Sequence, residues 1–217
     1  MSTSAKKQVR KPAAERKREI VEHAAAIALE FGLERVTVRA VAESLGVRPG
    51  LIGHYFPAVE AMVVAAFELA AEGEREYLVP PASAGSVIDR LAGFAAYATA
   101  KEAEPLARLW LNARNLCRFV PPLEAAVTRQ EHKSETLVRA LVAEGLADGS
   151  LRGVDPKVAA VQMLIAFDGV GSYANSYVPL LSAVESDGTA AAFETFVARV
   201  TELACGLPQG ELSRRRG

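Results

Sequence analysis

Cysteine is scarce in this chain, which has two such residues among 217. Two cysteines are too few for a disulfide framework, and neither Cys117 nor Cys205 belongs to a cluster with the spacing of a metal site. No apolar run approaches the length that spans a bilayer, and the polar, basic start of the chain lacks the apolar segment of a secretory signal. These absences predict a cytoplasmic protein that enters no membrane and binds no metal or other cofactor.

Strand-type alternation is also rare, because β-branched residues seldom alternate with polar ones, whereas alanine is abundant. Hydrophobic residues make up 50% of the chain and charged residues 24%, a balance that permits a sizeable buried core. The sequence therefore predicts an all-α fold. Apolar residues at helical spacing indicate nine helices at about residues 12–31, 37–45, 48–56, 57–77, 86–101, 104–118, 123–147, 155–177 and 189–205.

The net charge of −1 conceals a difference between two parts of the chain. Residues 1–57 contain ten Lys and Arg against six Glu, and the remainder contains 15 basic residues against 20 acidic ones. A basic N-terminal part beside an acidic remainder indicates that the first part meets a polyanion. Residues 1–11 are predicted to be a disordered basic arm, which could follow phosphates or enter a minor groove when DNA is present.

The stretch 37–56 has the pattern of two short helices about a tight turn. Thr37 is placed to cap the first helix, and Gly46 stands where that helix must end, in a position that favours a left-handed backbone. Pro49 fits the first turn of the second helix, where its missing N–H is no loss. This is the helix-turn-helix arrangement, whose second helix lies in the DNA major groove. The pattern alone also fits an ordinary helical hairpin packed in a core.

The second helix of this stretch has two different sides. Ile52 and Phe56 lie four positions apart and are expected to face the core, on a floor supplied by the helix at 12–31. The other side is expected to face outward. Its residues are Arg48, Leu51, Gly53, His54 and Tyr55.

The helix at 155–177 is apolar nearly all round and therefore has to be covered on all sides. Together with the helix at 189–205 it carries more apolar surface than one monomer can hide. We therefore expect a homodimer in which these two helices form a four-helix bundle about a two-fold axis. The alternative is that both are central core helices of a single chain.

A ligand pocket is expected between the helices at 86–177, lined by apolar groups and a few polar ones. Asp168 is the most informative candidate, because a carboxylate on an apolar helix needs a partner. That partner could be a cationic ligand, Arg114 or a backbone amide across the dimer. For each candidate taken singly, a structural role in the core is the simpler interpretation. The candidates are Tyr97, Trp110, Arg114, Phe119, Asp168 and Tyr173.

Two other classes of function are compatible with a helical chain. An enzyme would need a nucleophile and a base, and Cys117 with His132 is the one pair of that type, without an oxyanion site or phosphate loop in the sequence. We therefore expect no enzymatic activity. The alternative to DNA binding is an all-helical small-molecule binding or scaffold protein, and the charge difference between the two parts of the chain argues against it.

Residues 16–67 resemble the DNA-binding domain of TetR-family transcriptional regulators. The shared motifs are Phe31-Gly32 at the end of a basic helix, Thr37-Val38 ahead of Ala42, Leu45-Gly46-Val47, and Gly50 before Ile52-Gly53-His54-Tyr55-Phe56. Residues 145–171 are similar, more loosely, to the C-terminal domain of the subgroup that includes the choline/betaine regulator BetI. That likeness rests on Gly-Leu-Ala-Asp-Gly-Ser-Leu-Arg-Gly-Val-Asp-Pro-Lys-Val-Ala-Ala followed by Phe-Asp-Gly-Val.

The resemblance implies a nine-helix homodimer that represses transcription until a small-molecule effector enters its C-terminal domain. It divides the chain into a three-helix helix-turn-helix domain at 12–57, a ligand-binding and dimerisation domain at 58–207, and a disordered tail at 208–217. Matched residue by residue, it implies phosphate contacts by Thr37 and Tyr55 and base-edge contacts by Arg48, Pro49, Gly50, Leu51, Gly53 and His54. Arg39 is a further candidate for DNA contact.

Two positions depart from the family pattern. Arg48 stands where relatives often carry Ser or Thr, and it could read a guanine through O6 and N7. Val59 stands where relatives usually carry a phosphate-binding lysine, so the affinity for DNA should depend less steeply on salt. The subgroup resemblance also suggests a quaternary-ammonium effector held over Trp110 by cation–π attraction.

Overall fold

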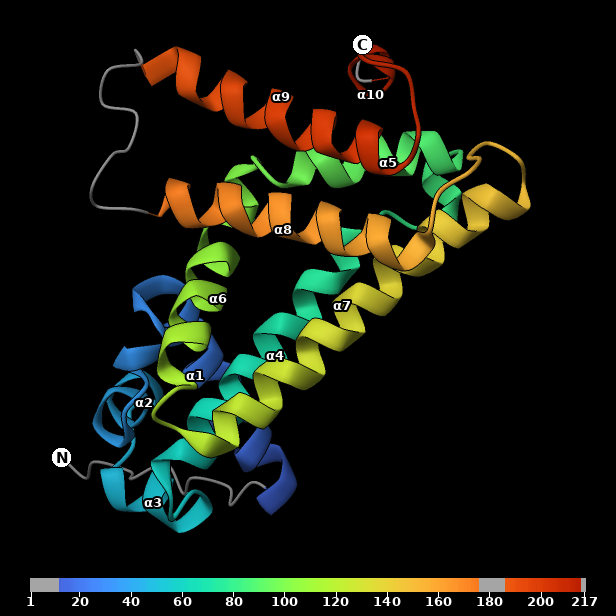
Figure 1. Ribbon diagram of the computed structural model, residues 1–217. Coiled ribbons are helices and arrows are strands. Elements are labelled where there is room, and N and C mark those ends of the chain that lie inside the picture. Colours follow the sequence, from blue (N-terminus) through green and yellow to red (C-terminus); the bar gives the residue numbers. More distant parts are fainter. Residues whose placement is uncertain (1–11, 176–185, 216–217) are drawn as a thin grey trace, which may run out of the picture.

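The computed structural model describes residues 12–175 and 186–215, and within them it contains ten α-helices and no strand (Figure 1). The all-α prediction is therefore confirmed. The expected basic arm at 1–11 lies outside the described residues. The helices are α1 Ala13–Phe31, α2 Val38–Leu45, α3 Pro49–Tyr55, α4 Val59–Leu78, α5 Val87–Tyr97, α6 Glu104–Leu116, α7 Pro121–Ala147, α8 Pro156–Ala174, α9 Ser186–Ala204 and α10 Glu211–Arg214.

Local sequence signals set the ends of several helices. The Oγ1 of Thr37 accepts a hydrogen bond from the backbone N–H of Ala40 at 3.1 Å, which confirms the predicted cap of α2. Gly46 ends α2 with a φ of 65°, a conformation that is unfavourable for a residue with a Cβ. At the start of α8 the carboxylate of Asp155 accepts hydrogen bonds from two backbone N–H groups of the first turn.

Two hydrophobic clusters make up the core, and α4 contributes to both. The first cluster joins α1, α2 and α3 to α4, α6 and the start of α7, and Phe67 of α4 lies in it. The second cluster joins Leu78, at the end of α4, to α5, α7, α8, α9 and α10. Figure 1 shows α4 and α7 running side by side from the part of the molecule that holds α3 toward α8 and α9. One continuous helix therefore connects the helix-turn-helix to the rest of the chain.

Residues 208–215, part of the tail at 208–217 expected to be disordered, contain a short helix, and residues 216–217 lie outside the described residues. Residues 206–210 turn the chain back, and Gly206 and Gly210 supply the positive φ values of 64° and 80° that this turn requires. The short helix α10 then buries Leu212 completely. The backbone N–H of Leu212 donates to a carboxylate oxygen of buried Glu202 on α9 at 3.0 Å. This helix escaped prediction because a single apolar residue in four shows no periodicity.

Within the described residues, no single helix is both long enough and apolar enough to cross a membrane. One pair of segments, α3 and the segment that begins with α4, reaches that length and hydropathy only when the two are counted together, and they meet at a bend of 79°. The same residues contain no group of three or more His, Cys, Asp or Glu placed to hold a metal ion.

Candidate nucleic-acid interface and ligand pocket

The helix α3 is attached to the first hydrophobic cluster by one apolar side. Ile52 is fully buried, and Phe56, which follows the helix, is 4% exposed. The opposite side faces solvent, which confirms the predicted core side and most of the predicted outward side, whereas Tyr55, expected to face outward, packs against the first cluster. Its exposed residues are Arg48, Pro49, Gly50 and His54, and its half-buried ones are Leu51, Gly53 and Tyr55.

At two positions of α3, packing inside the protein does not require a glycine. A Cβ built on Gly50 or Gly53 meets no atom within 4 Å, and neither residue has a positive φ. Glycine within a helix costs up to about 1 kcal/mol relative to alanine. The chain therefore carries this cost without an intramolecular gain. The missing side chains leave the backbone of α3 open to close approach by an external partner.

The other predicted DNA-contacting residues border α3. Thr37 and Arg39, at the start of α2, are both exposed. The ring of Tyr55 lies edge-on to that of His54, with the ring centroids 5.3 Å apart. All nine candidates lie in or directly beside α3 or at the start of the preceding helix, and none of the nine is buried.

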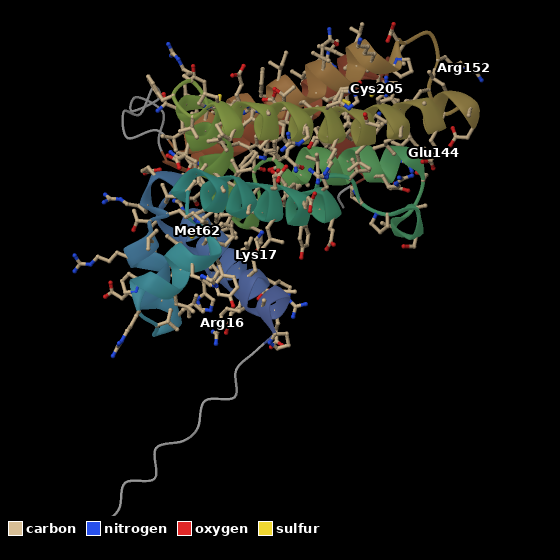
Figure 2. All side chains as sticks on the ribbon, turned by 90° about the horizontal axis from the view of Figure 1, so that it is seen from below. Arg16, Lys17, Met62, Glu144, Arg152 and Cys205 are labelled. Atoms are coloured by element: carbon tan, nitrogen blue, oxygen red, sulfur yellow. The ribbon has the colours of Figure 1, made fainter. Side chains whose placement is uncertain are left out.

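Basic side chains of α1 lie in the same part of the molecule. The ammonium of Lys17 stands 5.4 Å from the ring centroid of Phe56, which places a positive charge beside the end of α3. Figure 2 shows Arg16 and Lys17 in the part that holds α1, and Glu144 and Arg152 at the far end of the molecule. Basic side chains of α1 therefore lie in the same part of the molecule as the helix-turn-helix.

A cavity of about 180 Å³ lies between α4, α6, α7 and α8. It has an apolar wall and a polar wall. The apolar wall consists of Leu78, Trp110, Val161, Leu164, Ile165 and Phe167, and the polar wall of Glu74, Arg114, Glu131, Ser134, Glu135 and Asp168. An apolar pocket with a few convergent polar groups is the usual form of a small-molecule site.

Arg114 of α6 connects three helices at this cavity. Its guanidinium donates to Oδ2 of Asp168 on α8 at 2.6 Å and to Oε1 of Glu131 on α7 at 2.9 Å. It also lies over the ring of Trp110, 5.1 Å from the ring centroid. Burial raises the pKa of Asp168, and the positive charge of Arg114 offsets part of the rise. Of the three partners considered for Asp168, the structure shows Arg114.

Glu74 of α4 is the most deeply buried acidic residue of the cavity, with 3% of its surface exposed. Its Oε2 accepts a hydrogen bond from Nε1 of Trp110 at 2.5 Å. Burial raises the pKa of Glu74 to about 7, against the lowering effect of that hydrogen bond, so the carboxyl changes charge near neutral pH. Sequence reasoning missed this residue. The available signal was its position on the buried side of α4, between Phe67 and Leu78.

The six predicted ligand-binding residues do not all meet. Tyr97 packs behind the cavity against Phe167, with the ring centroids 5.9 Å apart. Phe119 falls in the link after α6 and is 74% exposed. Tyr173 lies on the outer side of α8 and is 50% exposed. The cavity itself brings together Trp110, Arg114 and Asp168.

The helices α8 and α9 together form an outward apolar groove of about 740 Å³. Ile165 and Tyr173 of α8 are 66% and 50% exposed, and Phe196 and Leu203 of α9 are 51% and 65% exposed. All four residues line the groove. A contiguous apolar surface of this kind marks an interaction site more often than an ordinary protein surface.

A second arginine of α6 reaches the end of α1. The Nη2 of Arg108 donates to the carbonyl oxygen of Leu29 at 2.6 Å and to that of Glu30 at 3.3 Å. These carbonyls belong to the last turn of α1, which has no basic residue of its own. A cation there satisfies free carbonyls and is favoured by the helix dipole. The helix α6 therefore contacts the end of α1 through one residue and the cavity through Trp110 and Arg114.

The pair considered for catalysis has other partners in the structure. The Sγ of Cys117 donates to the carbonyl oxygen of Arg114 at 3.2 Å. The Nδ1 of His132 lies 3.5 Å from Oγ1 of Thr136, one turn further along α7. Each side chain thus interacts within its own helical segment.

Comparison with known proteins was made for both the sequence and the fold. Residues 20–66 match the model of the tetR family of bacterial regulatory proteins. The search of curated proteins found no match. A Rhodococcus sp. protein described as a TetR-family transcriptional regulator has a TM-score of 0.70 and 19% identity, over 88% of this chain and 99% of its own.

Two further solved structures share the fold. GusR of Salmonella enterica has a TM-score of 0.64 and 18% identity, over 90% of this chain and 99% of its own. A protein from Saccharomonospora viridis, described as a transcriptional regulator and solved in complex with choline, has a TM-score of 0.65 and 16% identity, over 85% of this chain and 96% of its own.

Residues 20–66 are thus similar to the tetR family of bacterial regulatory proteins, and they contain the helix-turn-helix formed by α2 and α3. The fold as a whole is similar to those of solved transcriptional regulators. The helix-turn-helix prediction is therefore confirmed. The resemblance of residues 145–171 to the BetI-like subgroup stays a prediction, because the matching family model covers residues 20–66 alone.

Replacing Glu74 by glutamine is expected to make stability less sensitive to pH. Because burial raises the pKa of Glu74 from 4.5 to about 7, its contribution to stability is fully present below the unfolded value and is lost as the pH rises through the folded value. The loss is on the order of 3 kcal/mol. Glu74→Gln keeps an acceptor for Trp110 and removes the titration. Its gain in free energy of unfolding over the parent should therefore be larger at about pH 8 than at about pH 5.

Urea unfolding of both proteins at the two pH values measures this difference. The matched control is Glu76→Gln, an exposed position on the same helix, which should follow the pH dependence of the parent. Identical pH dependence of the Glu74→Gln variant and the parent would contradict the prediction.

Proposed function

We propose that the chain is a homodimeric transcriptional repressor that binds a palindromic DNA operator through α3 and releases it when a small-molecule effector occupies the cavity between α4, α6, α7 and α8. The observation that carries the proposal is the outward side of α3, on a segment that matches the tetR family of regulatory proteins. From that segment α4 leads directly to Glu74 at the cavity.

The outward side of α3 has the chemistry of a major-groove reader. Arg48 is exposed at the start of the helix and can donate to O6 and N7 of a guanine. Gly50 and Gly53 allow the helix backbone to approach the base edges closely. We assign base-edge contacts to Arg48, Pro49, Gly50, Leu51, Gly53 and His54, phosphate contacts to Thr37 and Tyr55, and a further DNA contact to Arg39.

The dimer interface is assigned to α8 and α9. Their apolar groove is exposed in one protomer, and a second copy that docks the same surface about a two-fold axis would remove it from water. The same two-fold axis then relates the two copies of α3, which should lie about 34–36 Å apart or a multiple of this distance. Because the two copies of α3 are related by two-fold symmetry, the operator has to be palindromic.

Effector and operator act in opposition through the protein. A ligand can favour a state in which the two α3 helices have a different spacing from the DNA-binding state. It then lowers the affinity for DNA by the ratio of its own affinities for the two states. By the same factor, bound DNA lowers the affinity for the ligand. Two helices are placed to transmit this effect. The helix α4 carries Glu74 and follows α3, and α6 carries Trp110 and holds the end of α1 through Arg108.

The competing proposal is an all-helical binding or scaffold protein that does not bind DNA. It predicts no retardation of the DNA upstream of its own gene in a gel shift, whereas a repressor retards that DNA and prefers it over unrelated duplexes. The same duplex then serves for the experiments below.

Arg48→Ala is expected to lower operator affinity and to relax selection at one base pair of each half-site. A bidentate contact to guanine is worth about 1–3 kcal/mol, or roughly five- to 150-fold in affinity. Selection from a random duplex library by the parent should enrich a guanine that the variant no longer requires. Arg152→Ala, an exposed position at the opposite end of the molecule (Figure 2), is the control and should select the parental site. Identical selections by the parent and Arg48→Ala would remove the guanine assignment.

Leu203→Glu is expected to separate the dimer. The side chain is 65% exposed in the protomer, so a carboxylate there is tolerated by the single chain but is buried without a partner in the proposed interface. Sedimentation velocity should show a monomer with an unchanged helical circular dichroism spectrum. Leu111→Glu on α6, where leucine is 39% exposed, is the control and should remain a dimer. A dimeric Leu203→Glu protein would move the interface away from this groove.

Arg108→Ala is expected to weaken communication between operator and cavity. Trp110 is the one tryptophan of the chain and lines the cavity, so its fluorescence reports on that site. Operator binding should change this fluorescence in the parent, and the change should shrink by about half or more when the bond from α6 to α1 is removed. Arg118→Ala, an exposed position after α6, is the control. An undiminished change in Arg108→Ala would leave α4 as the sole proposed route.

A further inference from the structure

The polar wall of the cavity carries an excess of negative groups. Its one guanidinium, that of Arg114, faces the carboxyl groups of Glu74, Glu131, Glu135 and Asp168. Arg114 already bonds two of them, Glu131 and Asp168. The guanidinium of Arg139 lies 3.4 Å from Glu135 but does not line the cavity. An anionic ligand would meet like charges here, whereas a cation would be attracted.

One buried hydroxyl of α7 lacks a hydrogen-bond partner. Ser134 is 6% exposed, lines the cavity, and its Oγ has no hydrogen-bond partner. The Oε1 of the neighbouring Glu135 is buried and has no hydrogen bond, although it forms an ion pair with Nε of Arg139 at 3.4 Å. A buried acceptor that stays unpaired destabilises the protein. A ligand that supplies N–H donors at this point would form the hydrogen bond that is missing.

The ring of Trp110 is already engaged by the protein on its face and at its nitrogen. The guanidinium of Arg114 occupies the face, 5.1 Å from the ring centroid, and the indole N–H bonds Glu74. A quaternary ammonium over Trp110, as the subgroup resemblance suggested, would have to displace Arg114. Such a cation also has no N–H group to offer Ser134 or Glu135.

The apolar wall fixes the rest of the ligand. Leu78, Leu164 and Phe167 line the cavity of about 180 Å³ together with the polar groups. This lining suits an apolar body, such as a ring or a short chain, joined to a polar head. A highly polar molecule would leave apolar side chains uncovered.

We propose that the effector is a compact primary or secondary ammonium with an apolar body, whose N–H groups are accepted by Ser134 Oγ and by the carboxylates of Glu135 and Glu74. The inference rests on the proposed function of this cavity as the effector site, and it names the chemical class that the site selects.

The affinity for such a cation should rise with pH. The groups that face Glu74 are Arg75 on its own helix, Tyr97 on α5, Arg114 on α6, Glu131 and Glu135 on α7, and Asp168 on α8. In this setting Glu74 has a pKa of about 7, and a bound cation favours its ionised form. Affinity should therefore increase by up to about tenfold from about pH 6 to about pH 8. Over this range an alkylammonium stays protonated, because its pKa is about that of lysine.

A matched set of four probes tests the proposal by isothermal titration calorimetry on the full chain. Benzylamine has the positive charge and the N–H donors. Benzyltrimethylammonium keeps the charge without donors, benzyl alcohol keeps a donor without charge, and benzoate reverses the charge. Benzylamine should bind about tenfold or more tightly than each of the others.

Two variants locate the binding. Ser134→Ala should lower the affinity for benzylamine several-fold and leave that for benzyltrimethylammonium unchanged, because the latter has no N–H group to lose. Glu135→Gln also removes a negative charge, so it should lower the affinity for both cations, and that for benzylamine more. Glu76→Gln, exposed on α4, is the control and should bind like the parent. Circular dichroism and thermal unfolding establish that each variant is folded.

The outcomes separate the two proposals. Suppose that benzyl alcohol, benzoate or benzyltrimethylammonium binds at least as tightly as benzylamine, and that mutations in the cavity weaken this binding. The ammonium class is then wrong and the effector site stands. If no probe binds while the parent retards its operator, the ammonium inference falls and DNA binding stands. If benzylamine binds and the chain retards no DNA, the site stands as inferred and the repressor proposal falls.

Discussion

A buried carboxyl and an indole N–H meet where α4 crosses α6, and the rest of the structure depends on this hydrogen bond between Glu74 and Trp110. Trp110 is 5% exposed and its ring stands edge-on to Phe67, one of the fully buried residues of the first cluster. Glu74 lies one turn before the second cluster begins at Leu78. Loss of either partner would leave a buried polar group unpaired, which costs about 1–3 kcal/mol. The bond therefore fixes the two helices relative to each other, and both clusters with them.

This junction places the cavity and the proposed DNA-binding surface in one packed unit. The polar groups that line the cavity come from four helices, and three of these helices, α4, α6 and α7, also contribute to the cluster that holds α3. Arg114 joins α6 to α7 and α8, and Arg108 joins the same helix to α1. Under the proposed function, a ligand that rearranges the first set of bonds would act on the second through α6. Close-packed interiors transmit such shifts because they are poorly compressible.

Much of the fold was predictable because its signals are local. The cap at Thr37, the left-handed Gly46 and the apolar side of α3 follow from three or four neighbouring residues, and the structure confirms them. The candidate site was only partly predictable. Trp110, Arg114 and Asp168 stood out as polar or aromatic residues on apolar helices, and they do line one cavity.

What sequence reasoning missed depends on contacts between distant segments. Glu74 looks like one more surface glutamate in a charged stretch, and only the packing of α6 against α4 buries it. Phe119 looks like a pocket residue, but α6 ends at Leu116 and leaves the ring in an exposed link. α10 is held by a carboxylate ten residues earlier in the chain, which no local pattern reveals.

The open space beside Gly50 and Gly53 bears on how such a protein diverges. Alanine at either position would meet no neighbouring atom, and would raise the intrinsic preference for helix by up to about 1 kcal/mol. If α3 reads DNA as proposed, changes at these two positions are selected by what docks against the helix and hardly at all by whether the domain folds. Diverging copies of the gene could then acquire new target sites at these positions at little cost in stability.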